Sequence, residues 1–197
     1  MNIRRLRPGT DIDEVSVFLA QLEAETGIPP LGESKFVDLV GPHRGVGFIA
    51  EERGRICAYL HLLQRESSQV WELEMAAEQL SKGDLEHLLA AAATEASSPM
   101  LWWTFGDGAL VAFASERFAV TRTLHKLVGS LPLPDPWHVP EGVRVAHFRP
   151  GIDEEHWLVA NNAAFEGHLE NGAWTVADVL ERESRDWFDA AGFRLWW

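Results

Sequence analysis

The chain has 197 residues, of which 46% are hydrophobic and 24% are charged, an ordinary composition for a globular protein. Its net charge of −13 argues against nucleic acid or an anionic membrane as the main partner, because both require a basic face. The single cysteine, Cys57, excludes an internal disulfide, and no apolar run reaches the roughly 20 residues of a membrane span. The N-terminus lacks the apolar segment of a secretory signal, so we expect a cytoplasmic protein.

Strands and helices alternate along residues 1–128, which predicts a domain of the α/β class (α+β type) with a mixed central sheet. The predicted strands cover residues 3–7, 45–51, 55–63, 69–75, 100–104 and 120–127. The predicted helices cover residues 10–27, 34–40, 83–96 and 108–116.

Two of these elements carry specific local signals. The helix over 10–27 is expected to begin with Thr10 as its N-cap, to have Asp13 in a capping box, and to end at Gly27. The strands over 45–51 and 55–63 are expected to form a hairpin around Glu52-Arg53-Gly54.

A proline-rich stretch over 129–142 predicts a semi-rigid linker, because prolines this dense continue neither a helix nor a central strand. After it, Arg149-Pro150-Gly151 repeats the motif Arg7-Pro8-Gly9 in the same setting of strand and acidic helix. We therefore expect a second, shorter copy of the same unit over 143–197, which gives the domains 1–128 and 143–197. Its predicted elements are a strand over 143–148, helices over 153–165 and 175–183, and a strand over 193–197.

The segment over 69–96 predicts a strand, a loop and a helix N-terminus, an arrangement that can hold a pyrophosphate with backbone N–H groups. The loop has one glycine, Gly83, and its acids Glu78, Asp84 and Glu86 would repel a phosphate that the helix dipole attracts. Two interpretations stay open, a phosphate cradle and a plain turn between strand and helix.

Other chemistries have little support in the sequence. The eight histidines show no metal-ligand spacing, so we expect no metal site, and no Gly-x-Ser-x-Gly motif is present to anchor a hydrolase. Cys57 lies in an apolar strand pattern and is interpreted as a small buried hydrophobe. The polar segment from Asn161 to Thr175 has the composition of a ligand rim, in which His168 is either a sugar contact or a loop residue without a ligand.

Several motifs together resemble a known family. They are PLGE at 30–33, the strand and loop over 72–83, WTFGD at 103–107, RTL at 122–124, VPEGV at 139–143, NNAAF at 161–165, and the residues Gly167, His168, Glu170, Gly172, Trp174, Thr175, Trp187, Phe188 and Asp189. With the predicted order of elements, these motifs resemble the Gcn5-related N-acetyltransferase (GNAT) family and, within it, the mycothiol synthases, which have two tandem GNAT domains. The resemblance implies a GNAT domain followed by a partial second one.

The family resemblance implies a reaction and a set of site residues. The reaction is the transfer of an acetyl group from acetyl-CoA to the cysteine amine of desacetylmycothiol, a cysteinyl-glucosaminyl-inositol. Substrate-contacting carboxylates fall on Glu33 and Glu170, and suit an ammonium and sugar hydroxyls. The acetyl-CoA contacts fall on Leu73, Glu74 and Met75 in the strand and on Ser81, Lys82, Gly83, Asp84, Leu85 and Glu86 in the loop. No catalytic residue of this chain is assigned.

This chain departs from the family pattern at several positions. Leu85 and Leu169 replace a family glycine and proline, and Gln69 stands at a strand position where a carboxylate would serve as base. The family's base and acid fall beyond Trp197, so we do not expect this chain alone to catalyse the reaction. The alternative is a non-catalytic GNAT-fold module for ligand binding or interaction. The short second unit is expected to pack on the first, to associate with another chain, or to expose an apolar patch around Trp187, Phe193, Trp196 and Trp197.

Overall fold

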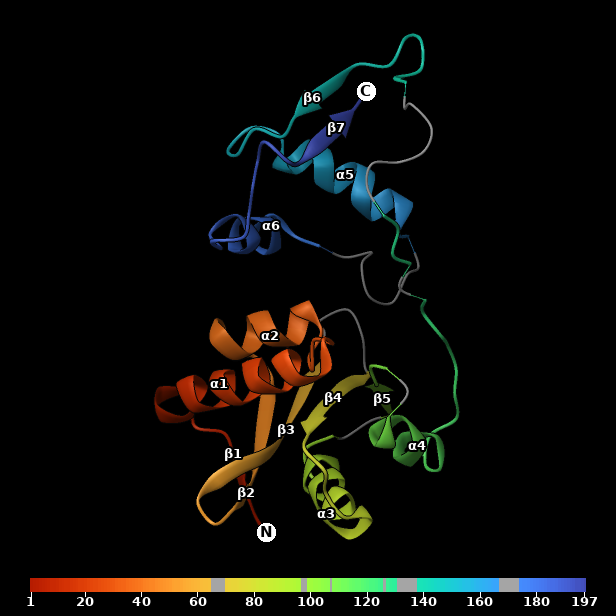
Figure 1. Ribbon diagram of the computed structural model, residues 1–197. Coiled ribbons are helices and arrows are strands. Elements are labelled where there is room, and N and C mark those ends of the chain that lie inside the picture. Colours follow the sequence, from red (N-terminus) through yellow and green to blue (C-terminus); the bar gives the residue numbers. More distant parts are fainter. Residues whose placement is uncertain (65–69, 97–98, 107, 126, 131–137, 167–173) are drawn as a thin grey trace. The chain divides into compact units, whose positions relative to one another are not determined.

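A computed structural model describes residues 1–64, 70–96, 99–106, 108–125, 127–130, 138–166 and 174–197 (Figure 1). The chain forms two compact units, Met1–Leu124 and His125–Trp197. This division does not test the predicted domains, 1–128 and 143–197 with a linker between them, which stay a prediction. None of the helices in the described ranges is long and apolar enough to cross a membrane.

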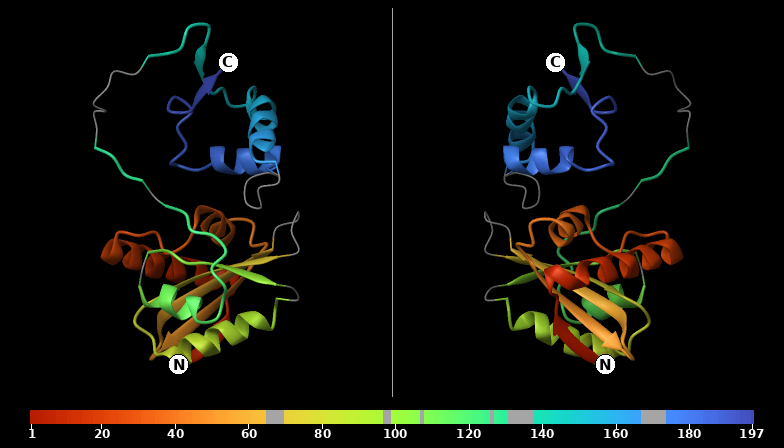
Figure 2. Two further views of the ribbon diagram at one scale, coloured as in Figure 1. Left: turned by 90° about the vertical axis from the view of Figure 1, so that its right-hand side faces the viewer. Right: turned by 90° about the vertical axis from the view of Figure 1, so that its left-hand side faces the viewer.

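The first unit is a five-stranded sheet with helices on both faces (Figure 2). Its strands, in sheet order, are β1 (Asn2–Arg5), β2 (Val46–Glu52), β3 (Arg55–Gln64), β4 (Trp71–Ala77) and β5 (Met100–Trp103). Its helices are α1 (Pro8–Thr26), α2 (Glu33–Val40), α3 (Lys82–Ala93) and α4 (Ala109–Ser115). Neighbouring strands are antiparallel except β4 and β5, which are parallel. The predicted α/β class with a mixed sheet is confirmed, and the order of elements from β1 to α4 is the predicted one.

Side chains along the strands point alternately to the two faces of the sheet, and each face has its own hydrophobic core. Ile49, Tyr59 and Ala76 pack against α1 and α2 on one face of the sheet. Leu60 and Leu73 pack against α3 and α4 on the other face. Because consecutive strand residues point to opposite faces, each central strand supplies both cores and is buried on both sides.

Strand β2 turns into β3 through two residues in the left-handed conformation, Arg53 (φ 53°) and Gly54 (φ 77°). Two consecutive positive φ angles give the turn a twist that matches the paired strands. The predicted hairpin is confirmed.

The start of α1 differs from the prediction. The helix begins at Pro8, because proline fixes φ at a helical value and needs no partner for a missing N–H. Arg7 is therefore the N-cap, and the predicted capping box of Thr10 and Asp13 is wrong. The predicted end at Gly27 is confirmed, with φ of 69°.

The strand predicted over 120–127 is also wrong. Its described residues form no strand, and the side chains of Val120 and Leu127 are 74% and 91% exposed. The β-branched and apolar residues of this segment favour a strand only where a neighbouring strand and a buried face exist, and here they have neither.

The described residues of the second unit form two strands and two helices, β6 (Val145–His147), α5 (Glu154–Ala164), α6 (Val176–Glu183) and β7 (Arg194–Trp196). Strands β6 and β7 are antiparallel, with Ala146 opposite Leu195. Thr175 and Asp178 form a capping box at the start of α6. Partly buried aromatic residues surround a small buried core of Phe148, Leu158 and Val179.

The repeated motif forms the same contact in both units, here called the Arg–Asp clasp. In the first unit the Arg7 backbone N–H donates to Asp11 Oδ2 at 2.7 Å, and its Nη2 donates to Oδ1 at 3.1 Å. In the second unit Arg149 donates to Asp153 in the same way, at 2.9 Å and 2.7 Å. Asp11 and Asp153 are 3% and 2% exposed, so each carboxylate is buried against its arginine.

Replacing Asp11 tests the clasp. Burial alone would raise the pKa of Asp11, but hydrogen bonds from Arg7 and Arg4 hold it well below its usual range. A lowered pKa stabilises the fold at neutral pH, and this contribution is lost as the pH falls through the pKa of the folded state. Asp11→Asn should lower the unfolding free energy at pH 7 by about 2 kcal/mol in urea denaturation. The deficit should shrink below about pH 4.

Asp13→Asn is the matched control, because Asp13 lies exposed on the same helix. It should change stability by less than about 0.5 kcal/mol. Equal losses in the two variants would contradict the clasp's role.

Candidate active site

The edge of β4 is open along part of its length. Strand β4 pairs with β5 from Trp71 to Glu74, where Glu74 lies opposite Trp103, but β4 continues to Ala77. Its last three residues therefore have no partner in β5, and those of their N–H and C=O groups that point away from β3 lie at a strand edge that β5 does not cover. An extended ligand with amide groups can bind such an edge.

Strand β4 then leads into the N-terminus of α3. Ser81 is the N-cap; its Oγ accepts the Asp84 backbone N–H at 3.2 Å and its hydroxyl donates to Asp84 Oδ2 at 2.6 Å. The first N–H groups of a helix lack partners within the helix, so this end suits an anionic group.

The structure also shows what surrounds the acids of this loop. Lys82 Nζ lies 2.6 Å from Glu116 Oε2, Glu86 forms an ion pair with Arg117, and Glu78 accepts two hydrogen bonds from Arg55. The pairs with Arg117 and Arg55 partly neutralise acids that would otherwise repel a phosphate, whereas the pair with Glu116 partly neutralises Lys82, a cation that would attract one. The predicted acetyl-CoA residues of the loop differ in exposure: Ser81, Lys82, Gly83 and Glu86 are exposed, Asp84 is half-buried, and Leu85 is in the core.

The three predicted acetyl-CoA residues of β4 are all buried. Leu73 and Met75 point into the core on the α3 face. Glu74 lies among the buried polar groups, as does Glu72 two residues earlier on the same face. Contact of Leu73 or Met75 with a ligand would therefore use the backbone.

A buried ion cluster joins α2 to β4. Lys35 contacts Glu72 Oε2, and its Nζ lies 3.5 Å from Glu74 Oε1. The three side chains are 2%, 6% and 4% exposed. The other oxygen of Glu74 accepts the Gly32 backbone N–H at 2.5 Å. Burial raises the pKa of Glu74, and Lys35 and Gly32 oppose this effect.

Sequence analysis missed Lys35 and Glu72. The signal was present as two acids two residues apart, Glu72 and Glu74, in a strand whose other central residues are apolar. Two carboxylates on one buried face require a cation, because an isolated buried charge is too costly. A search for that cation among nearby helices would have pointed to α2.

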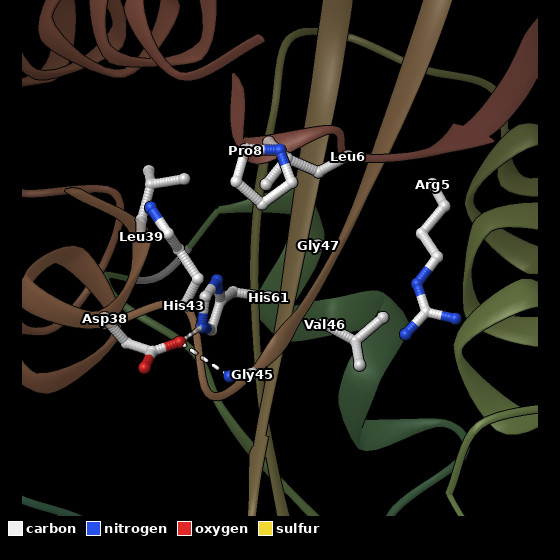
Figure 3. A pocket seen from close by; sticks show the side chains of 10 residues that line it. All are labelled: Arg5, Leu6, Pro8, Asp38, Leu39, His43, Gly45, Val46, Gly47 and His61. Atoms are coloured by element: carbon white, nitrogen blue, oxygen red, sulfur yellow. Dashed lines mark hydrogen bonds and ion pairs between the residues drawn. The ribbon is translucent and has the colours of Figure 1, made fainter. Parts of the chain in front are cut away.

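A second buried polar group lies on the same face (Figure 3). Asp38 accepts the backbone N–H groups of Arg44 and Gly45, each at 2.8 Å, and lies 3.1 Å from His61 Nε2. The Tyr59 hydroxyl lies 2.7 Å from His61 Nδ1. Because a carboxylate only accepts, Nε2 carries the hydrogen that faces Asp38. Burial raises the pKa of Tyr59, so its hydroxyl stays protonated.

The groups in Figure 3 also line a hollow of about 190 Å³. A Cβ at Gly45 would lie 2.4 Å from the Leu62 carbonyl oxygen and 2.8 Å from Asp38 Oδ2, so the turn approaches the strand too closely for any side chain. Asp38 therefore fixes this turn on β3. The only tyrosine of the chain takes part in this buried network.

The two predicted substrate carboxylates have different standing. Glu33 is the first residue of α2 and is exposed, directly after Gly32, whose N–H is bound by Glu74. Glu170 and His168 lie outside the described residues.

Asn162 joins the described residues on either side of 167–173. Its side-chain amide donates to the Trp174 carbonyl at 2.9 Å and accepts the Trp174 N–H at 3.2 Å. Asn162 thus has a structural role in holding the segment's ends together.

Glu33 directly follows Gly32, whose backbone N–H binds Glu74, so Glu33 lies near the carboxylates of β4. After β4 the chain continues to Ser81 at the start of α3.

Among the described residues, no group of three or more histidine, cysteine or acidic side chains could hold a metal ion.

Comparison with known proteins points to one group of enzymes. No family model matches the chain. The mycothiol acetyltransferase of Thermobispora bispora is 35% identical over 188 residues, which cover 92% of this chain and 63% of that protein. Those of Thermomonospora curvata and Actinosynnema mirum are 35% and 31% identical, and the matches cover 92% and 93% of this chain. This chain is a relative of the mycothiol acetyltransferases. It spans a little under two thirds of their length, with 64% and 65% coverage in the latter two.

Solved acetyltransferase structures also resemble the chain. One is an acetyltransferase with acetyl-CoA from Clostridium acetobutylicum, 18% identical with a TM-score of 0.43, covering 64% of this chain and 95% of that one. Another is an aminoglycoside N-acetyltransferase in complex with CoA, 16% identical with a TM-score of 0.46, covering 66% of this chain and 99% of that one.

Gly32 offers a test of the link between α2 and β4. A Cβ at Gly32 would lie 2.9 Å from Glu74 Oε1, so Gly32→Ala should push the carboxylate away from the Gly32 N–H. We expect a loss of about 1–3 kcal/mol in urea denaturation, the cost of an unsatisfied buried group.

The control is Gly9→Ala in α1. A Cβ there meets no atom within 4 Å, and alanine favours a helix, so stability should be unchanged or higher. A Gly32→Ala variant as stable as the wild type would show that the hydrogen bond to Glu74 contributes little.

Proposed function

We propose that this chain takes part in the transfer of an acetyl group from acetyl-CoA to the cysteine amine of desacetylmycothiol. The observation that carries the proposal is the 35% identity to mycothiol acetyltransferases over nearly the whole chain. The open edge of β4 and the helix N-terminus after it support the proposal, because they suit an extended ligand that carries amides and phosphates.

In this proposal acetyl-CoA lies beside Leu73, Glu74 and Met75 and contacts the backbone at the edge of β4 that opens after Glu74, since Leu73 and Glu74 pair with β5. Its pyrophosphate lies at the start of α3, near Ser81, Lys82 and Gly83. The neighbouring predicted contacts are Asp84, Leu85 and Glu86, of which Leu85 serves chiefly as a core residue. When bound, acetyl-CoA supplies the activated acetyl group; the chain's own residues orient it.

The acceptor is a small thiol precursor, cysteinyl-glucosaminyl-inositol. Glu33 and Glu170 are proposed to bind its ammonium and hydroxyl groups. Carboxylates accept hydrogen bonds from both kinds of group, and an ion pair with the ammonium adds charge complementarity.

A second function, ligand binding without group transfer, is supported by the contacts that the buried polar groups of the first unit make. The β4 carboxylates are engaged by Lys35, and the Tyr59 hydroxyl is engaged by His61. These contacts favour a first unit that binds a ligand without transferring a group. Acetyl-CoA binding by a fragment of residues 1–128 without release of CoA would support this module.

The second unit is proposed to associate with another chain. The side chain of Trp187 is 60% exposed and Trp197 is 50% exposed, which gives the unit apolar surface suited to an interface. Sedimentation velocity should show a concentration-dependent dimer that Trp187→Ser weakens. Val17→Ser, at an exposed position of α1, should leave it unchanged. A strictly monomeric wild type would contradict this.

Calorimetric titration with acetyl-CoA tests the cofactor site. With one glycine and several acids near the helix start, we expect affinity weaker than low micromolar. Asp84→Asn keeps an acceptor for Ser81 but removes a negative charge at the helix N-terminus, so affinity should rise about two- to fivefold. Asp178→Asn, at the same cap position of α6, should have no effect. Lower affinity in Asp84→Asn would contradict the placement of the pyrophosphate.

Titration with desacetylmycothiol tests the acceptor site. Glu33→Gln and Glu170→Gln should each weaken binding about tenfold or more, because each removes a charged hydrogen bond. Glu14→Gln, exposed on α1, is the control and should bind as the wild type. Unchanged binding in either site variant would remove that residue from the proposed site.

A further inference from the structure

Lys35 has an unusual environment for a lysine. Its side chain is only 2% exposed, although a lysine ammonium normally stays in water. It extends from α2 to two carboxylates of β4, Glu72 and Glu74, which are 6% and 4% exposed. The ammonium is therefore enclosed by oxygen acceptors.

Lys35 has two carboxylate partners on β4. Two carboxylates contact one ammonium, and the Gly32 backbone N–H also donates to Glu74. The acids also stand two residues apart, on one face of the strand. An apolar pair of similar size is often as stable as a buried ion pair, so stability alone gives no reason for this arrangement.

The cluster of Lys35, Glu72 and Glu74 lies next to the open edge of β4. Glu74 is the last residue of β4 that pairs with β5, and the open edge begins directly after it. The Lys35 ammonium thus lies beside the strand residues at which acetyl-CoA is proposed to bind.

We propose that Glu72 and Glu74 form a binding site for a primary ammonium group, and that Lys35 fills this site from within the chain. External amines are thereby kept out of the first unit. The ammonium site stands on the contacts of Lys35 alone; its meaning for acetyl transfer rests on the proposed function. The first unit then has an acetyl-CoA edge whose adjacent amine position is already occupied.

Chemical rescue tests the ammonium site. Lys35→Ala removes three methylenes and the ammonium, which together correspond to n-propylammonium. We expect the melting temperature of Lys35→Ala to fall by roughly 10–20 °C, because two buried carboxylates lose their cation. Millimolar n-propylammonium chloride should restore at least half of this loss in a saturable way. Neutral 1-propanol and tetramethylammonium chloride should not, since neither supplies three N–H donors.

The controls follow from the chain's other lysines and from the site itself. Lys82 pairs with Glu116 on the surface, so Lys82→Ala should show neither a large loss nor a response to n-propylammonium. In the double variant Lys35→Ala/Glu74→Gln, n-propylammonium should raise the melting temperature at least about fivefold less than in Lys35→Ala. Equal effects of n-propylammonium and 1-propanol on Lys35→Ala would overturn the proposal.

A measurement on the wild-type protein avoids any failure of Lys35→Ala to fold. Brief treatment with acetic anhydride and peptide mass spectrometry should show Lys82 modified at least about tenfold faster than Lys35. Comparable rates would overturn the proposal, because an occupied and enclosed ammonium is protected. Neither experiment contains acetyl-CoA, so a protein that fails to bind acetyl-CoA refutes the proposed function and leaves the ammonium site standing.

Discussion

The docking of α2 on the sheet depends on buried charges. Helix α2 has eight residues, too few to be stable alone, so contacts with the sheet must hold it. Lys35 and Asp38 are three residues apart and therefore share a face. Lys35 binds the acids of β4, and Asp38 binds His61 of β3 and the turn that leads into β2. The cation and the anion of one helix thus attach it to two neighbouring strands.

These contacts also connect the parts of the candidate site. The Gly32 N–H binds Glu74, and Glu33 follows at once as the first residue of α2. A shift of α2 would therefore move Glu33 relative to the open edge of β4. A buried ion pair permits few such shifts, since a displacement of α2 would weaken the contacts of Lys35 with Glu72 and Glu74. The candidate substrate residue lies on a short helix, but that helix is firmly attached.

The repeated Arg–Asp clasp shows which part of the unit is shared between its two copies. Both copies place the same arginine and buried aspartate near the start of their first helix, with Arg7 as the N-cap of α1 and Asp153 as the N-cap of α5. Beside the clasp they differ: Arg4 binds Asp11 in the first unit, whereas the matching position in the second is Ala146. The second unit has a hollow of about 410 Å³ there, bordered by Ala146, Asp153 and Trp197. The Arg–Asp clasp is kept, and the adjoining sheet face has changed.

Local chemistry explains which elements the sequence predicts well. The hairpin follows from residues that accept positive φ, and the second unit's final helix begins at a Thr–Asp capping box. The strand over 120–127 failed because a strand needs a neighbour that its own residues do not encode. The start of α1 failed because a proline outweighed a threonine cap.

The candidate site was harder to predict for a related reason. Hydrophobic patterning assigns a charged residue to the surface, so Lys35 in a short amphipathic helix attracts no attention. Its burial follows only from the two acids that β4 places opposite it, of which Glu72 lies 37 residues later in the chain. The family motifs led to Glu74 through its place on the acetyl-CoA strand, whereas its carboxylate binds Gly32 and Lys35. A motif carries over the position of a residue along the backbone; the partner of its side chain depends on the whole fold.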